Sequence, residues 1–141
     1  MKKKLDAAYG VIGLGRFGEA LATMLAQSGN EVIAVDKDEK KIREIRQYTD
    51  CAFVADNLSA DTLKEIGIQN CDVVIICIGE QVDVSVLTTM SVIEMGVPRV
   101  IAKALSPEQG AVLEKLGAEV VYPERDMALR LGKKLLSNNF F

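Results

Sequence analysis

A glycine-rich turn near the start of the chain limits which folds are possible. Residues 13–18 read Gly-Leu-Gly-Arg-Phe-Gly, between the apolar run Tyr9–Ile12 and an amphipathic run over residues 19–27. Gly13 permits a tight turn off a strand, Gly15 lets a phosphate approach the backbone, and Gly18 allows a helix to pack closely on a sheet. The free N–H groups and the dipole at the start of that helix suit a pyrophosphate. The pattern therefore predicts a nucleotide-binding strand–turn–helix unit.

A carboxylate follows at the spacing that such a unit requires. A second apolar strand, Val32–Asp36, ends on an acidic residue about 20 residues beyond the glycine turn. A carboxylate at this point accepts hydrogen bonds from a ribose diol and repels a phosphate on the 2′-hydroxyl. The alternative is a structural glycine turn followed by an aspartate that caps a helix. We favour the nucleotide site because both parts of the pattern occur together.

Strand-like and helix-like segments alternate along the whole chain. The expected strands are Tyr9–Ile12, Val32–Asp36, Ala52–Ala55, Val73–Ile78, Arg99–Ala104 and Glu119–Tyr122. The expected helices cover about 16–27, 38–48, 60–66, 82–95, 107–116 and 124–136. Six strand–helix units with the glycine turn in the first predict an α/β fold. We expect a Rossmann-like doubly wound parallel sheet of six strands in the order 3-2-1-4-5-6.

Composition and charge exclude several classes of protein. A chain of 141 residues with 49% hydrophobic and 26% charged residues is typical of one soluble globular domain. The longest apolar run, Val73–Ile78, is far shorter than the roughly 20 residues of a membrane span. The basic start, Lys2–Lys4, lacks the apolar segment of a secretory signal. A net charge of −3 and a pI near 5.1 argue against nucleic acid as a partner. These features indicate a cytoplasmic protein.

The chain offers little for catalysis. It contains no histidine, which removes the usual general acid–base groups and makes a zinc site improbable. Its three cysteines, Cys51, Cys71 and Cys77, form no metal-binding pair, and Cys51 and Cys77 are expected to be buried thiols within strands. No tyrosine has a lysine four residues later, as a hydride-transfer pair would require. We therefore expect no catalytic residue and favour a nucleotide sensor over an enzyme.

Further binding residues follow from the position of the ligand in such sheets. Ligands bind at the carboxyl ends of the strands, beside the point where the strand order reverses. Asp56, after the third strand, either contacts the adenine amino group or begins a turn. Gly79, after the fourth, either lies against the cofactor or opens a helix. Lys103 and Glu124, at the ends of the fifth and sixth strands, either reach the ligand or form a solvated pair at the rim.

Arg16 lies in the first turn of the first helix. A cation there opposes the helix dipole at a cost of a few tenths to about 1 kcal/mol. A bound phosphate would supply the missing anion, and the alternative is an exposed arginine without a role. The predicted cofactor-binding residues are Gly13, Gly15, Arg16, Phe17, Gly18, Asp36, Lys37, Asp56, Asn57, Gly79 and Lys103.

Several stretches together resemble RCK (regulator of potassium conductance) domains, which are also called KTN or TrkA-N domains. They are residues 11–18, 31–36, 55–56 with 63–68, 113–118 and 122–127. This combination covers nearly the whole chain and is far more specific than the glycine turn alone. The chain is most similar to the cytoplasmic gating subunit of bacterial Ktr/Trk-type potassium transporters. One departure is Asn57, where the family often has a small residue.

The resemblance implies a function beyond what the residues themselves indicate. It implies binding of ATP or ADP, or of NAD(H), and assembly of dimers into an octameric ring on an integral membrane potassium-translocating subunit at the inner face of the plasma membrane. Nucleotide exchange would change the ring and gate ion flux. Arg16 would reach a terminal phosphate, Asp36 would hold the ribose, and Glu124 would help to bind a cation (Mg²⁺, Ca²⁺ or Na⁺) at the dimer interface. The competing interpretation is the cofactor domain of an NAD-dependent oxidoreductase or of a redox-sensing regulator.

The end of the chain carries two further expectations. Residues 1–137 are expected to form the nucleotide-binding domain, and residues 138–141 to begin a hinge or tail before a C-terminal lobe that is absent from this chain. The two final phenylalanines indicate a truncated sequence or contact with a partner chain. Met127, Leu131 and Leu135 form an apolar stripe on the last helix, which packs either on its own sheet or at a dimer interface.

Overall fold

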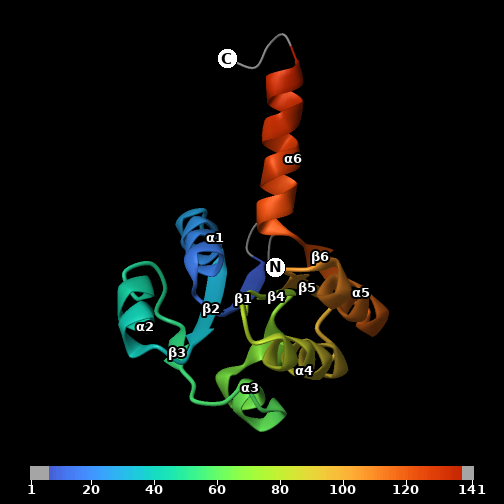
Figure 1. The fold of residues 1–141 in the computed structure, drawn as a ribbon. Helices are drawn as coiled ribbons and strands as arrows, with labels where there is room; N and C mark the ends of the chain where they lie inside the picture. The colour runs from blue at the N-terminus through green and yellow to red at the C-terminus, as the bar shows by residue number, and fades with distance from the viewer. Residues whose placement is uncertain (1–6, 138–141) are drawn as a thin grey trace.

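The computed structural model describes residues 7–137, and its parallel sheet has the order β3-β2-β1-β4-β5-β6, as predicted (Figure 1). The strands are β1 (Ala8–Ile12), β2 (Glu31–Asp36), β3 (Ala52–Val54), β4 (Val73–Ile76), β5 (Arg99–Lys103) and β6 (Glu119–Val121). The helices are α1 (Arg16–Gln27), α2 (Glu39–Ile45), α3 (Ala60–Ile66), α4 (Val82–Glu94), α5 (Pro107–Leu116) and α6 (Pro123–Leu136), with a 3₁₀ turn η2 (Ile68–Asn70) that was not predicted. The basic start at residues 2–4 and the hinge expected at 138–141 lie outside the described residues.

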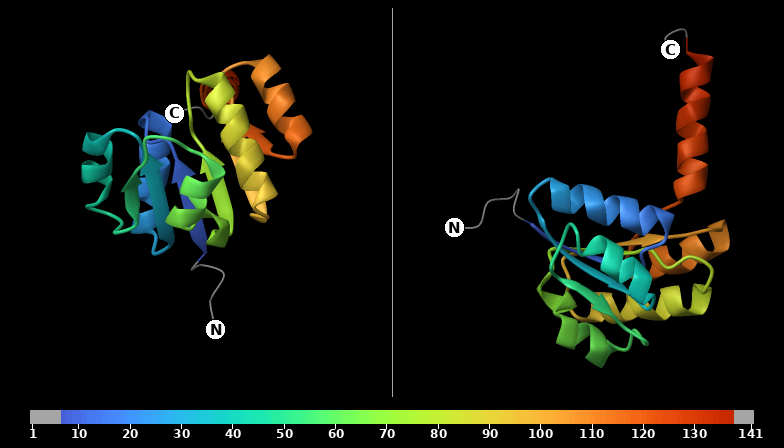
Figure 2. Two further views of the ribbon diagram at one scale, coloured as in Figure 1. Left: turned by 90° about the horizontal axis from the view of Figure 1, so that it is seen from below. Right: turned by 90° about the vertical axis from the view of Figure 1, so that its left-hand side faces the viewer.

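Helices cover both faces of the sheet. Figure 2 shows α1 and α2 on one face and α3, α4 and α5 on the other. Neighbouring strand residues point to opposite faces, so Val11 packs in the core under α1 while Ile12 packs in the core under α3 and α4. Each fully buried aliphatic side chain contributes about 1.5–3 kcal/mol. Burial on both faces explains why the central strands read as nearly continuous apolar runs.

The central strands end at the same edge of the sheet. Ile12 at the end of β1 pairs in register with Val35 of β2 and with Ile76 of β4. The chain leaves β1 through the glycine turn. β1 lies between β2 on one side and β4 on the other. This is the point where the strand order reverses, so the turn lies where ligands of doubly wound sheets bind.

Several predicted boundaries are corrected. β4 ends at Ile76 rather than Ile78, since its pairing with β1 stops at Ile12 and its pairing with β5 stops at Ala102. α2 ends at Ile45 rather than near residue 48, where the Thr49 hydroxyl donates to the Val32 carbonyl (2.6 Å) and draws the chain back to the sheet. Cys51 was predicted to be buried within a strand, which is wrong. It precedes β3 and is exposed, because β3 is an edge strand.

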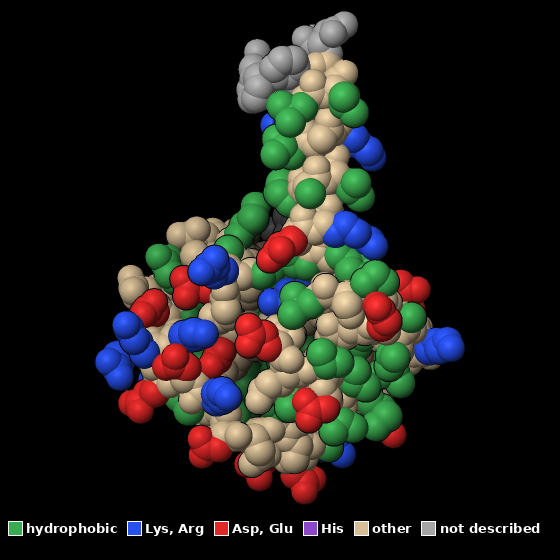
Figure 3. All heavy atoms as spheres, in the orientation of Figure 1, with side chains coloured by type: hydrophobic (Ala, Val, Ile, Leu, Met, Phe, Trp, Pro, Cys, Tyr) green, Lys and Arg blue, Asp and Glu red, His purple; other side chains and the backbone are tan. Residues whose placement is uncertain are grey.

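Helix α6 projects away from the rest of the domain (Figure 1). None of its residues is buried, and Met127, Leu131 and Leu135 are 59%, 49% and 49% exposed. Figure 3 shows its hydrophobic side chains in green on the projecting helix. The predicted apolar stripe therefore does not pack on its own sheet. Within residues 7–137, no helix is both long and apolar enough to cross a bilayer.

Candidate functional site

A cavity of about 910 Å³ opens at the carboxyl edge of the strands. The glycine turn, the ends of β2, β3 and β4, and the start of α4 form its walls. Its charged and amide-bearing lining residues are Asp36, Lys37, Lys41, Asp56, Asn57, Glu80, Gln81 and Lys103. The volume lies in the range of small-molecule and cofactor sites. We call this space the first cavity.

The glycine turn leaves one face of its backbone open. Gly13 has a φ of 99°, and a Cβ added there would lie 2.9 Å from the Cys77 carbonyl oxygen, so this position requires glycine. A Cβ added at Gly15 would meet no atom within 4 Å. Gly15 is also the N-cap of α1, and its helix end has no side-chain cap. The open backbone at Gly15 and the uncapped helix start are suited to an anion.

Gly18 has a different role from its neighbours in the turn. It lines no cavity and is buried, and a Cβ added to it would meet the carbonyl oxygen of Gly13. The same Cβ would lie 3.2 Å from the Cβ of Cys77. Gly18 therefore allows α1 to pack on the sheet and gives the turn its shape without facing the ligand.

The Asp36 carboxylate holds the turn in place. Its Oδ2 accepts a hydrogen bond from the Leu14 N–H (2.7 Å), and its Oδ1 accepts one from the Asp38 N–H (2.8 Å). Asp36 thus ties the glycine turn to the entry of α2, while its carboxylate also lines the first cavity. Each oxygen keeps a further lone pair that can accept from a ligand hydroxyl. The structural role and the predicted ribose contact are compatible.

Asn57 also serves the local structure. Its Oδ1 accepts from the Ser59 N–H (3.1 Å) and from the Thr62 hydroxyl (2.9 Å), which orders the start of α3. Ser59 is the N-cap of that helix. Asn57 and its neighbour Asp56 nevertheless line the first cavity, below the end of β3.

A second cavity of about 820 Å³ adjoins the first. The two share Gly79, Glu80 and Lys103 in their walls. Arg16 and Phe17 line the second cavity rather than the first, from the start of α1. Glu124, at the start of α6, lines it from the opposite side. Every predicted site residue except Gly18 therefore lies on one of two joined cavities.

Four cations of these cavities lack an ion-pair partner among the described residues, whereas Arg125 is paired with Asp126 (3.6 Å). Among residues 7–137, no ion pair is formed by Arg16, Lys37, Lys41 or Lys103. Lys103 is half-buried between the cavities, with its Nζ 3.7 Å from the Cβ position of Gly79. The expected rim pair of Lys103 with Glu124 is not formed. Positive charge is thus available to an anionic ligand.

Cys77 contributes an uncharged wall to the first cavity. Burial raises the pKa of its thiol to about 12, and the charge of Lys103 only partly opposes this shift. The side chain is therefore a neutral thiol at physiological pH. It acts as an apolar surface beside the glycine turn.

The described residues do not form a metal site by themselves. Within residues 7–137, no group of three or more cysteine, aspartate or glutamate side chains is arranged to hold a metal ion. Glu124 and Glu80 both line the second cavity and would offer carboxylate oxygens. A cation at Glu124 would need further oxygens from a ligand or from a second chain.

The prediction from sequence missed some lining residues. Lys41 of α2, and Glu80 and Gln81 before α4, line the first cavity, while Arg125 lines the second. The guanidinium of Arg125 stacks on the Tyr122 ring at 3.8 Å from its centroid. Lys41 lies three residues after the Asp38 cap, on the turn of α2 that begins beside the end of β2, and a position on a helix face gave no signal in the sequence.

The sequence matches a known family and several curated proteins. It matches the family model described as TrkA-N domain over residues 9–123. It is 41% identical over 140 residues to Ktr system potassium uptake protein C of Bacillus subtilis (strain 168). The matched region covers 99% of this chain and 62% of that protein. It is 40% identical over 132 residues to Ktr system potassium uptake protein A of Vibrio alginolyticus, with 93% and 60% covered. The chain thus spans about 60% of the length of these relatives.

Solved structures share the fold. The structure of GsuK bound to ADP superposes with a TM-score of 0.74 at 25% identity, over 93% of this chain and 34% of that one. The GsuK channel bound to NAD gives a TM-score of 0.75 at 25% identity, over 92% and 23% of the two chains. ADP and NAD, the ligands in these two structures, both contain an adenine nucleotide.

Proposed function

The chain belongs to the TrkA-N domain family, and we propose that it is the nucleotide-sensing part of a cytoplasmic regulatory subunit that gates a membrane potassium transporter. Its similarity to Ktr system potassium uptake proteins C and A supports the transport system. The structures of GsuK with ADP and with NAD support an adenine nucleotide as the ligand.

One observation carries the proposal: the glycine turn offers an open backbone beside joined cavities with uncompensated cations. Gly15 has free space at its Cβ position, and the start of α1 lacks a side-chain cap. Arg16 and Lys103 lie in the direction in which a phosphate chain would extend from the first cavity to the second. With no histidine in the chain, this arrangement favours binding over chemistry.

The nucleotide is ATP or ADP in this proposal, with NAD(H) as the competing ligand. Asp36 accepts from the ribose hydroxyls, and Arg16 reaches the terminal phosphate, which distinguishes ATP from ADP. Glu124 contributes one oxygen to a Mg²⁺, Ca²⁺ or Na⁺ ion shared with the phosphates and a second subunit. A ligand gates only through its difference in affinity for two shapes of the assembly, and an extra phosphate at Arg16 supplies such a difference.

Assembly completes the proposal. The exposed apolar stripe of α6, formed by Met127, Leu131 and Leu135, is assigned to the dimer interface. A projecting helix with half-exposed leucines gains stability by burying them against another chain. Dimers then form an octameric ring that docks on the integral membrane subunit, at the inner face of the plasma membrane.

Thermal unfolding with a panel of ligands tests the nucleotide. The purified chain is melted with ATP, ADP, NADH and NADPH, each with and without Mg²⁺ or Ca²⁺. A ligand at about 100 times its Kd adds roughly 2.7 kcal/mol, which raises the midpoint by about 5–10 °C in a domain of this size. Stabilisation by ATP or ADP that depends on the cation supports the gating role. A shift with NADH or NADPH alone favours the oxidoreductase or redox-regulator interpretation.

Two substitutions test the assigned residues. Asp36→Ala should abolish nucleotide binding in titration calorimetry, and unchanged affinity contradicts the ribose contact. Asp36 also accepts hydrogen bonds from two backbone N–H groups. The unfolding midpoint of the Asp36→Ala variant must therefore be measured beside that of the wild type. Arg16→Ala should weaken ATP while sparing NADH, and equal losses for both ligands contradict the terminal-phosphate role. Arg16 forms no ion pair within residues 7–137, so this second variant should fold normally.

A further inference from the structure

Two lysines lie at the ribose end of the first cavity. Lys37 directly follows β2, and Lys41 lies on α2, which begins next to the end of that strand. Both line the first cavity, and Lys41 is half-buried there. Within residues 7–137, neither ammonium group forms an ion pair. Arg43 of the same helix is instead paired with Glu39 (3.8 Å).

These lysines add positive charge to the cavity that Asp36 also lines. A lone carboxylate at the end of β2 repels a phosphate on the 2′-hydroxyl, whereas a nearby basic side chain accommodates one. Here both oxygens of Asp36 accept from backbone N–H groups, at 2.7 and 2.8 Å. The acids on this side of the cavity, Asp36 and Asp56, are matched in number by Lys37 and Lys41. The negative charge that would exclude a second phosphate is therefore offset.

We propose that the first cavity accepts adenosine nucleotides that carry a phosphate on the 2′-hydroxyl, and that Lys41, assisted by Lys37, binds this phosphate. Lys41 is the principal contact because its half-buried position limits the side-chain freedom lost on binding. The inference rests on the proposed nucleotide-binding function and concerns its ribose end alone. It departs from the expectation that the carboxylate after the second strand repels a phosphate on the 2′-hydroxyl.

A matched pair of ligands isolates the effect of the 2′-phosphate. Adenosine 5′-monophosphate and adenosine 2′,5′-bisphosphate differ only in that group, and titration calorimetry measures the Kd of each. The wild type should bind the bisphosphate at least as tightly as the monophosphate. Lys41→Met keeps an unbranched side chain of nearly the same length and removes its charge. It should weaken the bisphosphate about fivefold to tenfold, as expected for one charged contact, and change the monophosphate less than about twofold.

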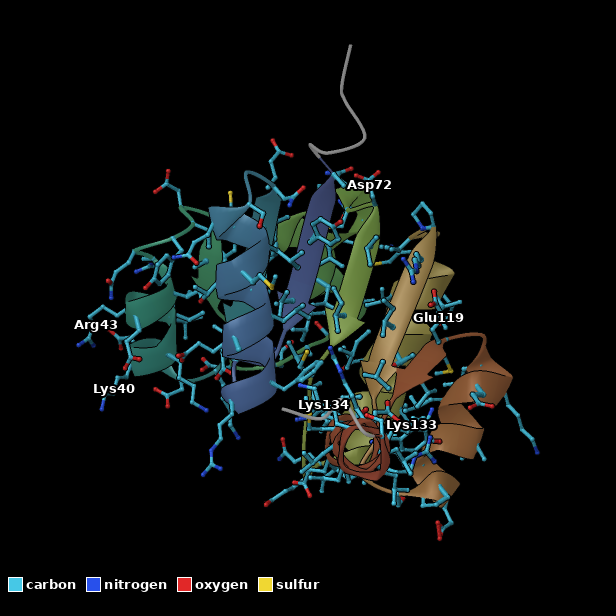
Figure 4. All side chains as sticks on the ribbon, turned by 90° about the horizontal axis from the view of Figure 1, so that it is seen from above. Lys40, Arg43, Asp72, Glu119, Lys133 and Lys134 are labelled. Carbon is cyan, nitrogen blue, oxygen red and sulfur yellow. The ribbon has the colours of Figure 1, made fainter. Side chains whose placement is uncertain are left out.

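Lys40→Met supplies the control on the same helix. Lys40 is exposed and lines no cavity, and Figure 4 shows its side chain pointing outward from α2, next to Arg43. This variant carries the same change in net charge and should bind both ligands like the wild type. Equal effects of the two variants would reduce the role of Lys41 to general electrostatics and overturn the proposal.

Other outcomes separate this inference from the proposed function. If the monophosphate binds and the bisphosphate binds at least about tenfold more weakly, Asp36 excludes the second phosphate and the inference is wrong while nucleotide binding stands. If Lys41→Met weakens both ligands equally, Lys41 does not recognise the 2′-phosphate. If neither ligand binds the wild type, the proposed function itself fails.

Discussion

Substitution by alanine at Gly15 and at Gly18, the second and third glycines of the turn, should have different effects. Gly18→Ala should lower stability, whereas Gly15→Ala should lower nucleotide affinity. At Gly18, the new Cβ meets the Gly13 carbonyl and lies 3.2 Å from the Cβ of Cys77, so backbone atoms must move. Overpacking of this kind costs about 1–3 kcal/mol or more, against about 1 kcal/mol gained from alanine in a helix. We expect a net loss near 2 kcal/mol, because the obstructing groups are not flexible side-chain ends. The midpoint of thermal unfolding then falls by about 5–10 °C.

At Gly15, alanine should preserve the fold and impair the site. The backbone there has φ −69° and ψ −167°, which any residue adopts, and the new Cβ meets no atom within 4 Å. Stability should be unchanged or up to about 1 kcal/mol higher, because alanine restricts the unfolded chain. The same methyl group occupies the space through which a phosphate approaches the backbone. Nucleotide affinity should therefore fall at least about tenfold, equivalent to about 1.4 kcal/mol.

Calorimetric melting measures the stability of both variants, and nucleotide titration measures their affinity for ATP or ADP. A Gly18→Ala protein that melts with the wild type would refute the packing argument. A Gly15→Ala protein that binds ATP or ADP with undiminished affinity would refute the assignment of this backbone to the phosphates. A Gly15→Ala protein that melts early would show that the space around Gly15 is not open.

Two further predictions concern charge and thiol chemistry. Arg99 donates to the Glu119 carboxylate at 2.6 and 2.9 Å and holds the pKa of Glu119 below its ordinary value of 4.5. The stabilisation from the Arg99–Glu119 pair is therefore complete at a pH above that ordinary pKa, and it is lost as the pH falls through the lowered pKa of Glu119. Glu119→Gln should lower the urea midpoint at neutral pH, and the difference from the wild type should disappear as the pH falls through the lowered pKa of Glu119. Exposed Cys51 should react with iodoacetamide first at about pH 8, while Cys77, with its pKa raised to about 12 by burial, stays unmodified in mass spectra until the protein is unfolded.

The strand order was predictable because local and topological rules agree. The glycine turn predicted the first strand–helix unit. Ser59 and Ser106 predicted the starts of two later helices, and the structure confirms both residues as N-caps. Right-handed crossovers between parallel strands then leave few arrangements for six such units. Boundaries were less predictable. β4 stops at Ile76, where its pairing with both β1 and β5 ends, and nothing in its own apolar sequence records that event.

The set of cavity residues was predictable in large part. Asp36, Asp56, Gly79 and Lys103 all follow strands whose carboxyl ends meet at one edge, so their positions in sequence sufficed to place them together. Lys41 was missed because it belongs to a helix face. Whether a helical lysine turns toward a cavity depends on how that helix is docked, and the sequence of α2 does not specify this.

The sequence by itself determined which groups meet at the site: a glycine-rich turn, an acid at the end of the second strand and no histidine. The tertiary structure alone decided how those groups are used. It showed that Asp36 bonds the turn through both oxygens, that Arg16 and Glu124 lie on a second cavity, and that α6 stands away from the sheet. The physical reason is the range of the interactions. Turn geometry and helix capping act within a few residues, so local sequence encodes them. Burial and charge compensation depend on segments that only folding brings together.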